Sequence, residues 1–167
     1  MSQPKKLILD EDRINQIIRR IAYQIHENNM GAKSLAIVGV CGQGFELAGR
    51  FADELRKIND KIKVDLLRID LDKSEPKDTA QLSEDVSALS GKSVILVDDV
   101  LNTGKILTHG LQVLLAADVE KIETAVLVDR GHPQFPISAT FSGYQLSTTL
   151  EEHVEVKLGK KPGVYLY

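Results

Sequence analysis

The chain has 167 residues, 43% hydrophobic and 27% charged, a balance that fits one globular domain with a buried core. Its net charge of −3 excludes a general electrostatic attraction to nucleic acids or membranes. The single cysteine, Cys41, excludes an intrachain disulfide, and no apolar run is long enough to span a membrane, so we expect a cytoplasmic protein.

The sequence predicts helices that alternate with strands. Apolar residues that recur every three or four positions indicate helices with one buried face, and short apolar runs indicate buried strands. In chain order, the predicted elements are a helix from Asp10 to Gly31, a strand at 35–40, a helix from the loop at 39–44 to Ile58, a strand at 63–69, a strand at 93–97, a helix at 104–116 and a strand at 122–128. This alternation is typical of an α/β fold with a parallel sheet.

Two stretches depart from the alternation. Residues 72–90 are polar, so we expect a long mobile loop or a weak helix there. After Asp129, short strands are expected at 141–144, 154–158 and 164–167, with no helix between them. We predict that these strands form a small accessory element at the edge of the sheet.

The most informative segment is SVILVDDVLNTGKIL, residues 93–107. An apolar strand leads into Asp98 and Asp99, and the turn 102–104 then begins a helix. The free N–H groups of a helix N-terminus suit a phosphate, Lys105 adds a cation, and the paired carboxylates are acceptors for a sugar diol. A pair of strand-end acids in another doubly wound domain is the alternative, which the attached turn and lysine disfavour. We therefore predict a sugar-phosphate site.

The glycine-rich loop at 39–44 is a weaker signal. Glycines between a strand and a helix are common for packing reasons alone, so only the place of this loop in the chain suggests ligand binding. Its thiol, Cys41, is of a kind that is more often inert than nucleophilic.

Segment 93–107 resembles the 5-phosphoribosyl 1-pyrophosphate (PRPP) signature of type I phosphoribosyltransferases. Three further segments, LILDEDRINQIIRRIAYQI, LAIVGV and AVLVDRGHPQFPI, extend the likeness over nearly the whole chain and resemble the family of pyrimidine-operon attenuators and uracil phosphoribosyltransferases. The resemblance implies one type I phosphoribosyltransferase domain over residues 1–167. It also implies a parallel sheet flanked by helices, and a small C-terminal hood contributed mainly by residues 129–167.

The resemblance carries a function with it. Enzymes of that family join uracil to PRPP and give UMP and pyrophosphate, and some members bind messenger RNA and attenuate transcription. The expected protein is therefore a pentosyltransferase of pyrimidine salvage that binds PRPP and a pyrimidine base. Magnesium would be carried mainly by PRPP, with no metal site of the protein's own. We also expect a homo-oligomer with no membrane partner.

The family's functional residues carry over by position. Asp98 and Asp99 are the predicted catalytic residues and would hold the ribose hydroxyls. The implied PRPP-binding segment is Asp98, Asp99, Val100, Leu101, Asn102, Thr103, Gly104 and Lys105. The implied pyrophosphate loop is Val40, Cys41, Gly42 and Gln43, and the implied nucleobase region is Val128, Asp129 and Arg130.

Three places depart from the family pattern. The family usually has a lysine and an arginine where this chain has Cys41 and Gln43, and a threonine where it has Ile106. A Tyr-Arg-Asp-Asp segment is replaced by residues 71–74, which keep one cation, Lys73. The missing cations and hydroxyl would weaken stabilisation of the leaving pyrophosphate more than they would weaken the fold. One alternative is therefore a catalytically weak nucleotide-binding relative.

An RNA-binding attenuator of transcription is the other alternative. Arg13, Arg19 and Arg20 form a small basic cluster on the first predicted helix, but Glu11 and Asp12 dilute it. With 21 basic against 24 acidic residues in the chain, we expect at most weak RNA binding.

Overall fold

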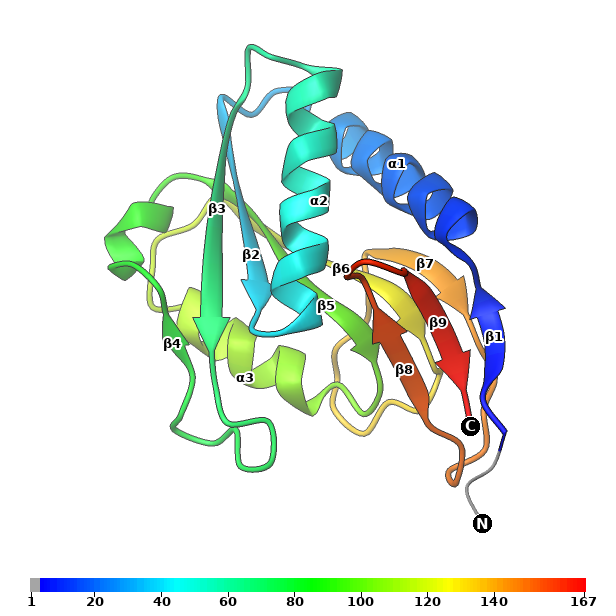
Figure 1. The fold of residues 1–167 in the computed structure, drawn as a ribbon. Coiled ribbons are helices and arrows are strands. Elements are labelled where there is room, and N and C mark those ends of the chain that lie inside the picture. The colour runs from blue at the N-terminus through cyan, green and yellow to red at the C-terminus, as the bar shows by residue number, and fades with distance from the viewer. Residues whose placement is uncertain (1–3) are drawn as a thin grey trace.

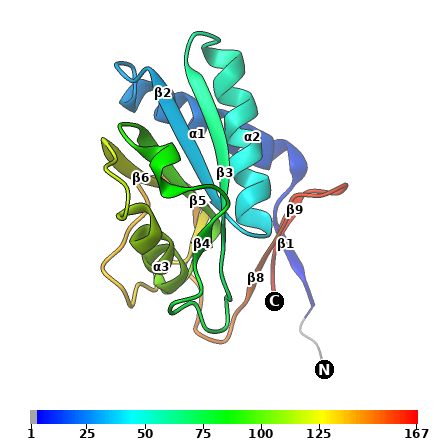
Figure 2. The same cartoon turned by 90° about the vertical axis from the view of Figure 1, so that its left-hand side faces the viewer.

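The protein is built in three layers, a central sheet with helices on both faces. The computed structural model describes residues 4–167, and its main sheet has six strands in the order β4-β3-β2-β5-β6-β7. Helices α1 and α2 cover one face and α3 covers the other (Figures 1 and 2). The strands are β1 (Lys6–Leu9), β2 (Ser34–Val40), β3 (Lys63–Asp70), β4 (Gln81–Leu82), β5 (Ser93–Leu101), β6 (Lys121–Asp129), β7 (Phe141–Gln145), β8 (Val154–Lys157) and β9 (Gly163–Leu166). The helices are α1 (Glu11–Asn28), α2 (Gln43–Ile58), the 3-10 turn η1 (Val86–Leu89) and α3 (Lys105–Leu114).

Five neighbouring strands of the main sheet run parallel. Strands β3, β2, β5, β6 and β7 pair in parallel register, and only β4 at one edge is antiparallel. Both faces of such a sheet are covered, which explains why β2 is buried along almost its whole length. The carboxyl ends of the parallel strands share one edge of the sheet. The predicted α/β fold with a parallel sheet is confirmed.

Two apolar clusters join the layers. One fills the space between the sheet, α1 and α2, where Phe51 is fully buried. The other lies under α3 and includes Leu89, Leu107 and Leu114. Since α2 and α3 each begin directly after a strand of the sheet, these clusters hold both helix N-termini in place at its carboxyl edge.

Helix α1 begins as its sequence predicts. The Asp10 side chain caps it by accepting from the N–H of Arg13 at 2.9 Å, and two acids follow in the first turn. Ile14, Ile18, Ile21 and Ile25 form the buried stripe. Among residues 4–167, no helix is both long and apolar enough to cross a membrane.

A separate three-stranded sheet, which we call the hood, has the strand order β1-β9-β8. Two of its strands come from the predicted accessory element, but the third is the N-terminal strand Lys6–Leu9, which the sequence analysis did not assign. Strand β7, expected in that element, instead extends the main sheet beside β6. The loop at 130–140 makes this parallel connection without a helix, so the usual sequence signal of a crossover is missing.

The polar stretch 72–90 is a long connection with little regular structure. It contains the two-residue strand β4 and the 3-10 turn Val86–Leu89, whose Leu89 is buried in the second cluster. Strand β5 continues to Leu101, beyond the predicted end at residue 97. Asp98 and Asp99 therefore lie within strand β5, near its end, and not in the loop that follows.

Candidate functional site

The acid pair and the turn after β5 lie together at the carboxyl edge of the sheet. A hollow of about 200 Å³ opens there between the end of β5 and the start of α3. It is lined by Lys73, Asp98, Val100, Leu101, Asn102, Thr103, Gly104, Lys105, Ile106 and Leu107. The structure thus brings seven of the eight residues of the implied PRPP-binding segment onto one hollow, Asp99 being the exception.

The turn before α3 has the geometry of an anion cradle. Gly104 adopts the left-handed conformation (φ 86°) as N-cap of α3, and a Cβ at this position would come within 2.6 Å of Ile137 Cγ2. The N-cap glycine has no side chain to cap this helix, so the N–H groups of its first turn after Lys105 remain free for a ligand. The Thr103 hydroxyl accepts from the N–H of Lys105 at 3.3 Å. Free amides, a hydroxyl and a lysine therefore converge on the hollow.

Asp98 is a buried carboxyl group. It is 4% exposed, and its Oδ1 accepts from the N–H of Asp99 at 2.9 Å. Burial, followed by the charge and hydrogen bonding of Asp99, raises the pKa of Asp98 well above its usual value, and nearby Lys73 counteracts this rise. A buried acid with a raised pKa in a hollow is a typical mark of a functional site.

The first turn of α2 packs directly on this carboxyl group. A Cβ at Gly44 would lie 2.8 Å from Asp98 Oδ1, so only glycine allows the contact. The glycine-rich loop before α2 is thereby placed beside the acid pair. The structure brings together two motifs that stand more than fifty positions apart in the chain.

Lys73 reaches into the same region from the loop after β3. Its Nζ lies 3.5 Å from the point where a Cβ on Gly42 would stand, and it lines the hollow that contains Asp98. The sequence analysis noted Lys73 as a retained cation but did not assign it to the site. The only sequence signal was one lysine in a polar stretch, and a contact across thirty residues of chain leaves no local pattern.

The backbone of the loop at 40–43 is anchored to its neighbours. Val40 is buried at the end of β2, and the N–H of Cys41 donates to the carbonyl of Ile69 at 2.8 Å. The Cys41 thiol lies 3.7 Å from the carbonyl oxygen of Leu71. The loop is therefore anchored to the end of β3 and to the residue that follows it.

The implied nucleobase region follows β6 and lies next to a second hollow of about 180 Å³. Asp129 and Arg130 line it, and Val128 is buried in the strand behind them. Asp129 Oδ1 accepts from the N–H of Gly131 at 2.9 Å, which shapes the turn.

Arg130 connects the implied nucleobase region to two neighbouring segments of the chain. Its guanidinium is buried and donates to Thr148 Oγ1 at 3.0 Å, Asn102 Oδ1 at 3.2 Å, and the carbonyls of Thr149 and Glu152. Its donors are thus committed to protein acceptors, and they join the turn after β5 to the segment that enters the hood. The side chain of Arg130 orders this wall of the site.

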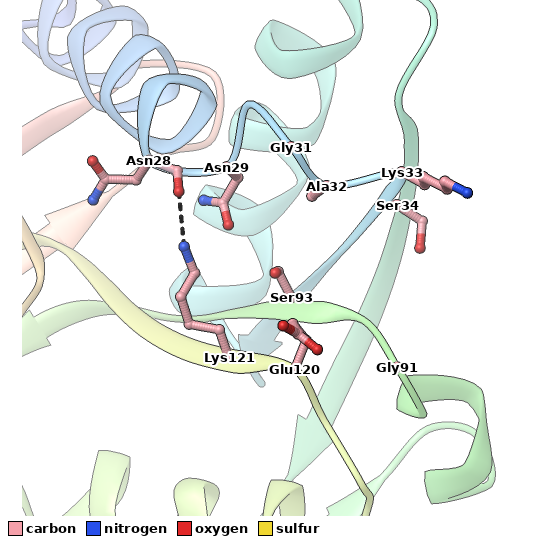
Figure 3. Close-up of a pocket in the computed structure, with 10 residues that line it drawn as sticks. All are labelled: Asn28, Asn29, Gly31, Ala32, Lys33, Ser34, Gly91, Ser93, Glu120 and Lys121. Carbon is pink, nitrogen blue, oxygen red and sulfur yellow. Dashed lines mark hydrogen bonds between the residues drawn. The ribbon is translucent and has the colours of Figure 1, made fainter.

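A larger hollow, of about 530 Å³, lies elsewhere (Figure 3). It is at the amino ends of β2, β5 and β6, where Lys121 Nζ donates to the carbonyl of Asn28 at 2.8 Å. Ligands of parallel α/β sheets bind at the carboxyl ends of the strands. Because the acid pair and both helix N-termini lie at that opposite edge, we place the site there despite the smaller volume.

Asp98 and Asp99 offer carboxylates beside the turn that precedes α3. Within residues 4–167, no group of three or more His, Cys, Asp or Glu side chains is placed to hold a metal. Magnesium prefers phosphate oxygens and water with one or two carboxylates. The residues therefore fit a magnesium ion that arrives on a phosphorylated ligand.

The raised pKa of Asp98 predicts how stability depends on pH. The folded chain binds more protons than the unfolded chain above the usual carboxyl pKa of 3.8, so the free energy of unfolding falls as the pH rises from there to the raised pKa. The substitution Asp98→Asn removes this pH-dependent loss of stability. It keeps a side-chain oxygen that can accept from the N–H of Asp99. We expect the variant to be more stable than the parent at neutral pH, with a flatter profile in denaturant unfolding between about pH 4 and pH 8.

The exposed Asp118 provides the control for this prediction. Asp118→Asn makes the same chemical change away from the site and should leave the pH profile unaltered. A parent protein that equals or exceeds Asp98→Asn in stability at neutral pH would contradict the burial argument.

Comparison with known proteins identifies the family. The phosphoribosyl transferase domain matches residues 6–159. The "Bifunctional protein PyrR" of Deinococcus radiodurans is 38% identical over 98% of this chain and 93% of its own length, and that of Fusobacterium nucleatum is 35% identical over 98% and 96%. A solved hypoxanthine-guanine phosphoribosyltransferase from Bacillus anthracis shares the fold, with a TM-score of 0.77 and 18% identity over 98% of both chains. The chain belongs to the phosphoribosyl transferase domain family, among relatives named bifunctional PyrR proteins.

Proposed function

We propose that this protein transfers the phosphoribosyl group of PRPP to uracil, giving UMP and pyrophosphate. In this reaction the bond between the anomeric carbon and a pyrophosphate oxygen breaks, and its electrons leave with pyrophosphate. A bond forms from the ring nitrogen of uracil, whose proton is released. The observation that carries the proposal is the meeting of the acid pair, of which Asp98 is buried, with two helix N-termini that lack an N-cap side chain at one sheet edge.

Each part of the substrate has a matching part of the site. Asp98 and Asp99 would hold the ribose hydroxyls, and the turn 102–105 would bind the 5′-phosphate through free amides and Lys105. The loop at 40–43 would face the pyrophosphate. The turn at 128–130 would lie beside the base, with the hood above it. Positioning of this kind is most of what such a reaction needs from a protein.

Lys73 fits the role of cation for the leaving group. It lies over Gly42 and beside the hollow of the acid pair, where the loop itself supplies no charged side chain. A cation is worth most where negative charge grows in the transition state. Magnesium, carried mainly by PRPP, would supply further neutralisation of that charge when bound.

The setting of the proposed reaction is the cytoplasm, with the protein acting as a homo-oligomer. Large apolar side chains that remain exposed in one copy would contribute to contacts between copies. They include Leu7, Tyr23, Met30, Leu115 and Leu150.

The proposed function is tested with a panel of free bases. Purified protein is mixed with PRPP, magnesium and uracil, cytosine, hypoxanthine, guanine or adenine, and the release of pyrophosphate is followed. We expect release with uracil alone. Turnover of a purine and not of uracil would reject the substrate, and PRPP binding without turnover of any base would favour the weak nucleotide-binding relative.

Lys73→Met tests the proposed cation. We expect PRPP binding, measured by calorimetry with magnesium at fixed ionic strength, to weaken by about 1.5–3 kcal/mol, the usual worth of a hydrogen bond to a charged group. Lys77→Met is the matched control, because Lys77 is an exposed lysine of the same loop. Equal losses in both variants would show only a general charge effect, and no loss at Lys73 would show that it does not contact bound PRPP.

The structure also bears on the alternative of an RNA-binding attenuator. On α1, Arg20 donates to the carbonyls of Ser142 and Gly143, and Arg13 lies over the ring of Tyr144. Arg19 lines a hollow whose other charged residues include both signs. The three arginines therefore do not form one open basic surface, which supports transfer as the primary function.

A gel-shift experiment with the pyrimidine-operon leader of the source organism checks this ranking. We expect salt-sensitive binding with a dissociation constant at or above roughly the micromolar range, equal to that of a scrambled RNA of the same length. Tight binding that UMP strengthens, and that Arg19→Ala with Arg20→Ala abolishes, would make regulation the primary function.

A further inference from the structure

Leu158, the residue that follows strand β8 of the hood, is held by two side chains of α2. Gln43 Oε1 accepts from the N–H of Leu158 at 2.8 Å, and the Arg50 guanidinium donates to the carbonyl oxygen of the same residue. Gln43 and Arg50 stand seven positions apart, so they lie on one face of the helix. Figures 1 and 2 both show the end of β8 beside the beginning of α2.

The Leu158 N–H depends on this acceptor. Leu158 has no exposed surface, and its side chain belongs to the core cluster under α1 and α2. A buried N–H that loses its partner cannot turn to water. Position 43 must therefore provide an oxygen, which glutamine and glutamate have and which methionine, lysine and arginine lack.

Gln43 also stands between two glycines that adjoin the candidate site. Gln43 is the first residue of α2, between Gly42, over which Lys73 lies, and Gly44, which packs on Asp98. Its backbone is part of the loop assigned to pyrophosphate, while its side chain points to the hood. Gln43 thus connects two parts of the site that are more than a hundred residues apart in sequence.

We propose that Gln43 is a positioning residue that fastens the hood to the pyrophosphate loop through the Leu158 N–H. This inference rests on the proposed function, in which the hood covers the base. The acceptor at position 43 sets the placement of the hood, and hence the affinity for the base. The charge at position 43 acts separately, on PRPP.

Three variants separate the acceptor from the charge. Gln43→Met removes the acceptor without adding charge, Gln43→Glu keeps it and adds a negative charge, and Gln43→Arg removes it and adds a positive charge. Gln16→Met, on the exposed face of α1, is the matched control. Two quantities are measured for each: hydrogen exchange of the Leu158 amide without substrate, and the KM values for uracil and PRPP.

The expected results divide the variants by whether they keep the acceptor at position 43. The Met and Arg variants should exchange the Leu158 amide roughly tenfold faster or more, as expected when a buried amide loses its acceptor. Their KM for uracil should rise severalfold. The Glu variant should keep slow exchange and the parent KM for uracil but show a raised KM for PRPP, because its charge repels the pyrophosphate. The control should match the parent in every quantity.

The outcomes that would overturn the inference are distinct from those that concern the function. Unchanged Leu158 exchange in Gln43→Met would show that the contact does not hold the hood. Faster exchange with an unchanged KM for uracil would show a structural contact with no role in positioning. A parent protein that turns over no base would reject the proposed function, while the exchange data would still decide whether Gln43 holds Leu158.

Discussion

The burial of Asp98 beneath the first turn of α2 is the constraint on which the rest of this structure depends. Removing a carboxylate from water costs several kcal/mol, and a second acid next to it adds repulsion. Lys73 offsets part of this cost through its charge. A group that opposes folding and yet stands at the centre of the sheet edge is better explained by what it binds than by stability.

The topology of the sheet explains how this acid meets its partners. Because β2, β5 and β6 are parallel neighbours, the loops that follow them all leave at one edge. Helix N-termini after β2 and β5 face the same space, and Arg130 after β6 ties its turn to Asn102. One packing arrangement therefore places the segments predicted to bind sugar, phosphates and base side by side, although they are distant in sequence.

The parts of this arrangement that are local in sequence could be predicted, and those that depend on distant contacts could not. The apolar periodicity gave α1 and α2 and the parallel strands, and the acid pair with its turn indicated the sugar-phosphate site. The pairing of Lys6–Leu9 with β9 joins the two ends of the chain, so no local pattern reveals it. The same holds for Lys73 above Gly42 and for Gln43 with Leu158. The assignment of individual residues to PRPP, pyrophosphate and base stays a prediction.

The loop at 40–43 shows why side chains and backbone must be considered separately at such a site. Its backbone contributes a helix N-terminus, which attracts an anion whichever side chains are present. Its side chains at 41 and 43 face neighbouring carbonyl and amide groups of the protein, and the nearby cation comes from another loop. An arginine at position 43 would therefore exchange an acceptor that Leu158 needs for a charge that Lys73 already brings near. Such an exchange would weaken the attachment of the hood while it adds a second positive charge beside the pyrophosphate loop.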